Sequence, residues 1–307
     1  MRSLVQALAR RPVLAAVLGA LTIAFSAIFV ELADVTPATA AIFRCAYALP
    51  PLALLAWLEQ RRYGPRARGQ AQLAWIAGAF FAADLVLWHH AIDQVGAGLA
   101  TVLGNTQVVF VPIAAWLFLG ERPGGRVAAS VPVVLIGVVL ISGVIGEGAY
   151  GRDPLLGVLL GLGTGVAYAG FIIVQRRANR DHRRPAGPLF DATLSAAVFS
   201  TLIGLPLGEV DLVPSWPSHL WLLLLALGVQ VVGWLLISIS LPRLPAAITS
   251  VVLTLQPVGS VLLGIWILSE APSELQLLGV GLILAGLLMV TLRVRPRRWR
   301  RAQPEVG

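Results

Sequence analysis

Two opposite charges stand inside apolar runs of this sequence. Arg44 lies in the stretch AIFRCAYALP, and Asp84 lies in FFAADLVLWHH. An arginine keeps its charge in a protein, and a charged side chain in hydrocarbon costs about 2.5 kcal/mol or more. A guanidinium binds a carboxylate or phosphate through two parallel hydrogen bonds. The two residues therefore predict an anion-binding role for Arg44 and a counter-ion or proton-coupling role for Asp84.

The composition indicates that these runs cross a membrane. Of the 307 residues, 57% are hydrophobic and only 12% are charged, with a mean hydropathy of +0.83. A soluble domain carries roughly twice that share of charge. The apolar runs are about twenty residues long, as a helix needs to cross about 30 Å of hydrocarbon. Ten transmembrane helices are predicted near residues 13–32, 38–58, 71–92, 96–119, 127–145, 154–175, 188–207, 218–240, 246–268 and 274–292.

Arginine predicts the orientation of these helices. The chain has no lysine, and with the N-terminus in the cytoplasm all of its 23 arginines except Arg44 and Arg152 fall in cytoplasmic segments. We therefore expect a multi-pass protein of the plasma (inner) membrane with both termini in the cytoplasm. The basic tail is expected to lie on anionic lipids. Because the basic residues are spread over short loops, nucleic acid is not an expected partner.

The first span has an alternative interpretation as a secretory signal peptide. Arg10 and Arg11 precede it, and a small-residue stretch at 38–40 follows it. Its apolar core is long for a signal peptide, however, and cleavage would leave an odd number of spans. We therefore prefer a transmembrane helix.

The two halves of the chain share a pattern. The stretch TQVVFVPIAAWLFLGERP aligns with LQPVGSVLLGIWILSEAP, which pairs Gln107 with Gln256 and Glu121 with Glu270. Both glutamates are expected at helix ends, in capping roles. Each half holds five predicted spans, and because five is odd the second half enters the membrane from the opposite side. Inverted repeats are typical of transporters that alternate access to a site near the membrane midplane.

The predicted organisation is a first repeat at 1–146, an inverted repeat at 147–293 and a basic tail at 294–307. With a glutamate–proline stretch after the fourth helix of each half (LGERP and LSEAP), the chain resembles the drug/metabolite transporter superfamily, EamA type. The resemblance covers residues 13–292. It implies an all-α membrane protein whose ten helices, as two inverted five-helix repeats, surround a central cavity.

The resemblance further implies export or exchange of a small metabolite such as an amino acid. A secondary transporter is expected, because no GxxxxGK[ST] motif for ATP is present. One departure concerns proline: Pro257 in the second half has Val108 as its counterpart in the first half, where Pro112 stands instead.

Residue counting places the buried charges at similar depths. Arg44 lies about 9 Å and Asp84 about 12 Å from the outer ends of their helices, so we expect them to pair, with Asn105 nearby. Substrate binding and a purely structural pair both stay open. Asp191 takes the place in the seventh span that Arg44 takes in the second. A gating role and a merely favourable charge near a helix start are both open for Asp191.

Neutral polar and aromatic residues near the middle of the spans complete the expected cavity lining, although hydrogen bonding between helices is an alternative role for them. The expected substrate contacts are Arg44, Asp84, Asn105, Gln107, Tyr168, Gln230, Trp234 and Gln256.

His89 and His90 lie near the outer end of the third span. Adjacent residues face different sides of a helix, so we expect no metal site. An interfacial aromatic cluster with Trp88 and external pH sensing are both open, the latter with a coupling role for His89. An intramembrane enzyme with a site near Asp84, His89 and His90 is the alternative function, but HExxH is absent. We expect no enzyme activity and no cofactor. Homo-oligomerisation stays open.

Overall fold

The computed structural model describes residues 11–111, 113, 124–179, 184–240, 252 and 255–291, and every regular element in these ranges is a helix. Glu121, Pro112 and the basic tail at 294–307 lie outside the described residues. The helices are α2 (Pro12–Ala24), α3 (Ser26–Ala33), α4 (Pro37–Tyr63), α5 (Arg68–Val95), α6 (Ala97–Gly104), α8 (Gly125–Ile141), α9 (Pro154–Ala178), α10 (Ala186–Leu207), α11 (Trp216–Leu224), the π-helix η1 (Leu225–Gly233), α12 (Trp234–Ser240), α14 (Leu255–Ile267) and α15 (Glu274–Thr291).

Ten apolar helical segments occur in the described part of the chain, one at each predicted span. Six are 22 to 28 residues long, enough to cross a membrane: Pro12–Ala33, Pro37–Tyr63, Arg68–Val95, Pro154–Gln175, Ala186–Leu207 and Trp216–Ile237. Four are shorter: Ala97–Val111, Gly125–Ile141, Leu255–Ile267 and Glu274–Val290. Large apolar side chains such as Leu159, Leu205 and Leu262 point outward and are about 60% exposed, as a lipid-facing surface requires. The predicted all-α membrane fold is confirmed.

Proline and glycine mark several helix boundaries. α2, α4 and α9 begin at Pro12, Pro37 and Pro154, because a proline in the first helical turn loses no hydrogen bond there. α4 and α5 end at Gly64 and Gly96, whose φ angles of 82° and 84° favour glycine. The break predicted before Pro37 is therefore present.

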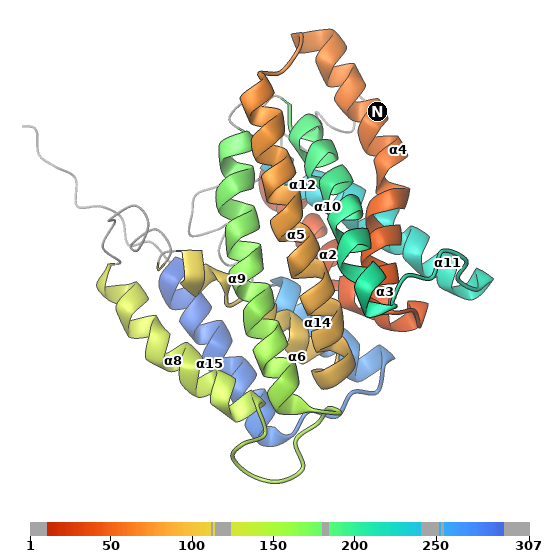
Figure 1. Cartoon of the computed structure of the whole chain (residues 1–307). Coiled ribbons are helices and arrows are strands. Elements are labelled where there is room, and N and C mark those ends of the chain that lie inside the picture. Colours follow the sequence, from red (N-terminus) through yellow and green to blue (C-terminus); the bar gives the residue numbers. More distant parts are fainter. Residues whose placement is uncertain are drawn as a thin grey trace, which may run out of the picture.

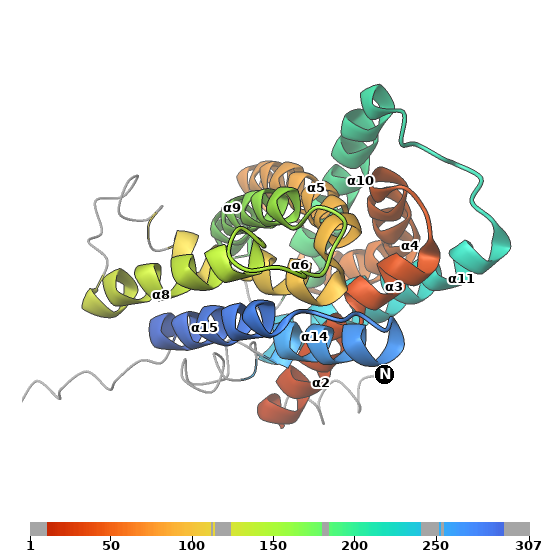
Figure 2. The same ribbon diagram turned by 90° about the horizontal axis from the view of Figure 1, so that it is seen from below.

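The longest helices lie in the middle of the molecule. α9, α5, α10 and α4 follow one another as packed neighbours (Figure 1), and α8 lies along α15 at one edge in both views (Figures 1 and 2). The short helix α6 is enclosed by α5, α9 and α14 (Figure 2). The buried residues of α6 lie in the main hydrophobic core.

Each span of the first half can be matched with the span five later in the chain. Under this match, the contacts between helices fall into equivalent pairs. The contact of α5 with α9 then corresponds to that of α12 with α2, and the contact of α5 with α10 corresponds to that of η1 with α4. The contact of α6 with α9 corresponds to that of α14 with α2. Three further contacts, α4–α10, α6–α14 and α8–α15, each join a span to its own counterpart, so the match leaves them unchanged. This pattern is the one expected of two halves related by a twofold axis.

Glycine permits the closest helix contacts. Gly157, Gly161 and Gly165, spaced four residues apart, lie on the side of α9 that faces α5 and the segment after it. A Cβ atom on Gly161 would lie only 2.6 Å from Leu103 Cβ, so no larger residue fits there. Close packing at this series lets α9 support helices that line the cavity described next.

Candidate functional site

A cavity of about 80 Å³ lies within the bundle, where α2, α3, α4, α5, α6, α9, α12 and α14 meet. Six of the eight residues predicted to contact substrate line it: Arg44, Asp84, Asn105, Tyr168, Trp234 and Gln256. Gln107 and Gln230 do not line the cavity. The remaining lining residues are Ile23, Ser26, Phe81, Leu85, Trp88, Thr101, Gly104 and Thr164.

Arg44 is held in one orientation by its neighbours. The side chain is buried, its Nε–H donates to Gln230 Oε1 at 3.0 Å, and its Nη1 donates to Ser26 Oγ at 3.1 Å. The ring centroids of Phe81 and Trp88 lie 5.7 and 5.9 Å from the guanidinium carbon, within the range of cation–π attraction. Because a guanidinium carries five N–H groups, three have no partner among the described residues and are available to a ligand in the cavity.

The predicted ion pair between Arg44 and Asp84 is wrong. No nitrogen of Arg44 lies within 4.0 Å of an Asp84 oxygen, although both side chains line the same cavity. Gln230 and Ser26 satisfy the guanidinium instead. Asp84 is buried, and its carboxylate has no hydrogen-bond partner among the described residues. The guanidinium of Arg44 and the carboxyl group of Asp84 thus share a cavity without forming an ion pair.

Two further polar atoms on the cavity wall have no hydrogen-bond partner within the described ranges. They are Thr164 Oγ1, on a side chain only 2% exposed, and Trp234 Nε1. Leaving a buried polar atom unsatisfied costs about 1–3 kcal/mol. Groups of this kind point to a bound water or ligand.

Aromatic rings form one side of the site. Phe81 stacks on Phe171 with ring centroids 4.7 Å apart, and Tyr168 meets Trp234 edge-on at 6.4 Å. These rings provide an apolar surface beside the two charges. The arrangement suits a small molecule with charged and apolar parts.

The polar residues Asn105, Gln107 and Gln256, also predicted to contact substrate, differ in whether they line the cavity. Asn105 Nδ2 donates to Thr101 O at 2.8 Å and leaves the amide oxygen for the cavity. Gln107 is buried away from the cavity, while its repeat counterpart Gln256 lines it. The twofold relation therefore does not place the two glutamines in equivalent surroundings.

Asp191 lies outside the cavity and pairs with a different arginine. Its Oδ2 accepts from Arg66 Nη2 at 2.7 Å. Nearby, the Glu59 carboxylate accepts from the backbone N–H groups of Ala186 and Gly187 at 3.0 and 2.9 Å, which caps α10. Together these contacts fasten the start of α10 to the end of α4.

The two histidines do not form a site with Asp84. His89 is fully buried, and its Nδ1 donates to Pro37 O at 2.9 Å, so it is poorly placed to sense external pH. His90 is partly exposed and lies 3.2 Å from the Glu209 carboxylate. Among the described residues, no three His, Cys, Asp or Glu side chains converge as metal ligands would.

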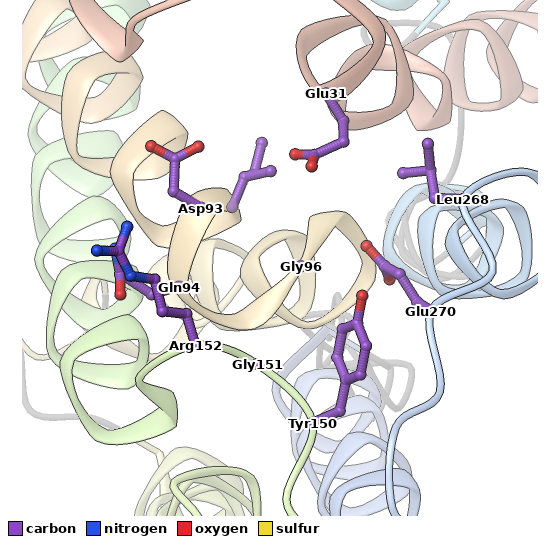
Figure 3. A pocket seen from close by; sticks show the side chains of 10 residues that line it. Glu31, Asp93, Gln94, Gly96, Tyr150, Gly151, Arg152, Leu268 and Glu270 are labelled. Atoms are coloured by element: carbon purple, nitrogen blue, oxygen red, sulfur yellow. The ribbon is translucent and has the colours of Figure 1, made fainter. Parts of the chain in front are cut away.

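Glu270 connects the two halves at the end of the bundle shown in Figure 3. Its carboxylate accepts from the backbone N–H groups of Ala97 and Gly98 and so caps α6 of the first half. Figure 3 shows the Tyr150 hydroxyl pointing toward Glu270 across a pocket of about 230 Å³ that Glu31 also lines. Burial raises the pKa of Glu270, and the two N–H groups offset only part of that rise. The sequence predicted a capping role for Glu270, but it did not predict that the capped helix belongs to the other half of the chain.

Sequence reasoning missed several residues of the site. Phe81 precedes Asp84 by three positions and Thr101 precedes Asn105 by four, so helical spacing could have placed both on the cavity face. Thr193, which accepts from Gln230 Nε2 at 3.3 Å, carries no such signal. The π-helix η1 was also missed, since its turns look like ordinary apolar sequence.

Comparison with known proteins agrees with this architecture. One solved crystal structure of a protein matches with a TM-score of 0.62 at 20% identity, over 92% of this chain and 98% of that chain, which shows the fold alone. The threonine/homoserine exporter RhtA of Escherichia coli K12 is 29% identical over 68% of this chain and 67% of its own. The pseudopaline exporter CntI of Pseudomonas aeruginosa UCBPP-PA14 is 26% identical over 91% of this chain and 95% of its own.

A family model matches both halves. The EamA-like transporter family aligns with residues 10–143 and again with residues 155–292. These two matches account for nearly all of the ten apolar segments. The protein therefore belongs to the EamA-like transporter family.

Proposed function

We propose that this protein is a secondary exporter or exchanger of a small zwitterionic metabolite of the amino-acid class. The observation that carries the proposal is that Arg44 and Asp84, both buried, line one cavity without forming an ion pair. Two buried opposite charges that do not touch are costly unless something lies between them. An amino acid supplies a carboxylate for Arg44 and an ammonium group for Asp84.

The relatives support the same class of substrate. One is named an exporter of threonine and homoserine, and another an exporter of pseudopaline. The aromatic side of the cavity, formed by Phe81, Tyr168 and Trp234, favours a substrate with some apolar surface. The bound molecule would also satisfy Thr164 Oγ1 and Trp234 Nε1.

Transport proceeds by alternating access between two inverted repeats, residues 1–146 and 147–293. The paired helix contacts support this mechanism, because halves related by a twofold axis can exchange conformations. The arginine distribution supports an inner-membrane orientation with both termini in the cytoplasm and anionic lipid beside the basic tail. Within this proposal the chain performs no catalysis, and Asp84 is the residue through which protons couple to transport.

The test is exchange of radiolabelled amino acids, L-threonine and L-homoserine first, in proteoliposomes that contain the purified protein. The variants are Arg44→Met and Asp84→Asn, and Arg61→Met is the matched control because Arg61 lies outside the cavity against Trp57. We expect amino-acid flux in the wild type, no flux in Arg44→Met, and wild-type flux in Arg61→Met. Asp84→Asn should remove the dependence of flux on a proton gradient. Flux that survives Arg44→Met in folded protein, or no flux in the wild type, contradicts the proposal.

A further inference from the structure

Gln230 contacts Arg44 but does not line the cavity. It belongs to the π-helix η1, Leu225–Gly233, and the backbone N–H of Trp234 donates to Val229 O five residues back, as π-helical geometry requires. π-Helical turns are rare and frequently occur at functional sites. Here one such segment carries Gln230 and leads directly into Trp234, which lines the cavity.

Gln230 links three helices through its amide. The side chain is 0% exposed; its Oε1 accepts from Arg44 Nε at 3.0 Å, and its Nε2 donates to Thr193 Oγ1 at 3.3 Å. Because the Nε–H of Arg44 can only donate, it sets the amide with Oε1 toward Arg44, and the Thr193 hydroxyl accepts from the other end. The Nε edge of the guanidinium is thereby occupied, and the second contact, from Nη1 to Ser26, holds the plane of the group.

We propose that Gln230 is a positioning residue that aims the remaining Nη N–H groups of Arg44 into the cavity and thereby selects substrates that carry a carboxylate. The inference rests on the proposed function and goes beyond it, because the sequence had suggested Gln230 as a direct substrate contact. Gln230 acts through Arg44 and does not touch the substrate.

The neutral amide is the essential feature of this position. A carboxylate of the same size would accept the same hydrogen bond, but it would also form a buried ion pair with Arg44. The charge of Arg44 would then be neutralised from behind, and the carboxylate of the substrate would compete with it. An amide holds the guanidinium without using its charge.

This difference separates a positioning role from a packing role. The test is to measure KM and kcat for exchange of radiolabelled L-threonine by the full-length variants Gln230→Glu and Gln230→Leu in proteoliposomes. If Gln230 only packs, the isosteric glutamate variant should resemble the wild type more closely than the leucine variant. If Gln230 positions Arg44, the order reverses: Gln230→Glu raises KM about tenfold or more, and Gln230→Leu raises it less, with kcat less affected in both.

Acidic pH provides a second readout. Asp84 makes the KM of every variant depend on pH, so each KM is compared with that of the wild type at the same pH. Protonation of the introduced carboxyl group removes its charge, so lowering the pH should bring the KM of Gln230→Glu closer to the wild-type value, whereas the ratio for Gln230→Leu should stay constant. Gln276 is the matched control, because it is also 0% exposed and bonded through both amide atoms, to Tyr150 O, Ile141 O and the Tyr150 N–H, but lies outside the cavity. Gln276→Glu and Gln276→Leu should lower stability without changing KM.

An arginine-specific dicarbonyl reagent tests the contact without any substrate. Mass spectrometry of the Arg44 peptide should show slower modification in Gln230→Glu and faster modification in Gln230→Leu, with wild-type rates in the Gln276 variants. Equal Arg44 reactivity in both Gln230 variants, or a KM in Gln230→Glu closer to the wild type than in Gln230→Leu, overturns the proposal. If the wild type exchanges no amino acid, the proposed function fails while the labelling result still decides the role of Gln230.

Discussion

Replacing Glu270 with alanine removes the cap that the second half of the chain places on α6 of the first half. Two backbone N–H groups, those of Ala97 and Gly98, then lose their acceptor in a place where Glu270 itself is only 4% exposed. Each unsatisfied buried group costs about 1–3 kcal/mol, and relief of the buried carboxylate offsets part of the loss. We expect a net destabilisation of about 2–4 kcal/mol. Glu270→Gln keeps one acceptor oxygen and should lose about half as much.

The assay is equilibrium unfolding of the purified protein in mixed micelles across a range of pH. A carboxyl group whose folded-state pKa is raised stabilises the protein at low pH, and that contribution is lost as the pH rises through the folded-state pKa. The contribution of Glu270 should therefore decline as the pH rises above its ordinary pKa of 4.5, and Glu270→Gln should lack this decline. Glu274→Gln, an exposed first-turn residue of α15, is the control and should change little. Equal stability of Glu270→Ala and the wild type would refute the cap as a link between halves.

Two other substitutions test the packing and the cavity. Gly161→Val places side-chain atoms against Leu103 Cβ, so it should lower the yield of folded protein. Gly163→Ala is the control and should fold normally, because the atom nearest to the added Cβ is the flexible end of Leu87 at 3.3 Å. Size-exclusion chromatography of both variants measures the folded fraction. Thr164→Val removes an unsatisfied buried hydroxyl group and should therefore leave stability unchanged or raised while KM for exchange increases. Lower stability with an unchanged KM would show that the hydroxyl group serves packing.

The transmembrane layout could be read from the sequence because it depends on local properties. A run of about twenty apolar residues crosses the bilayer whatever its neighbours are, and Pro37 and Gly96 set helix limits through their own backbone preferences. The close approach of α9 at Gly161 was likewise predictable from residue size and spacing. Six of the eight expected substrate contacts reached one cavity because buried polar residues in a membrane rarely face lipid.

The partners of those residues were decided only by the tertiary structure. Counting residues along a helix gives depth, but not the direction in which a side chain points or which helices are neighbours. Arg44 and Asp84 therefore matched in depth and yet do not pair, because η1 and α3 bring Gln230 and Ser26 to the guanidinium first. Asp191 binds Arg66 for the same reason, since packing of α10 on α4 sets that contact. Sequence by itself determined which charges lie in the membrane, and packing determined which of them stay free for a substrate.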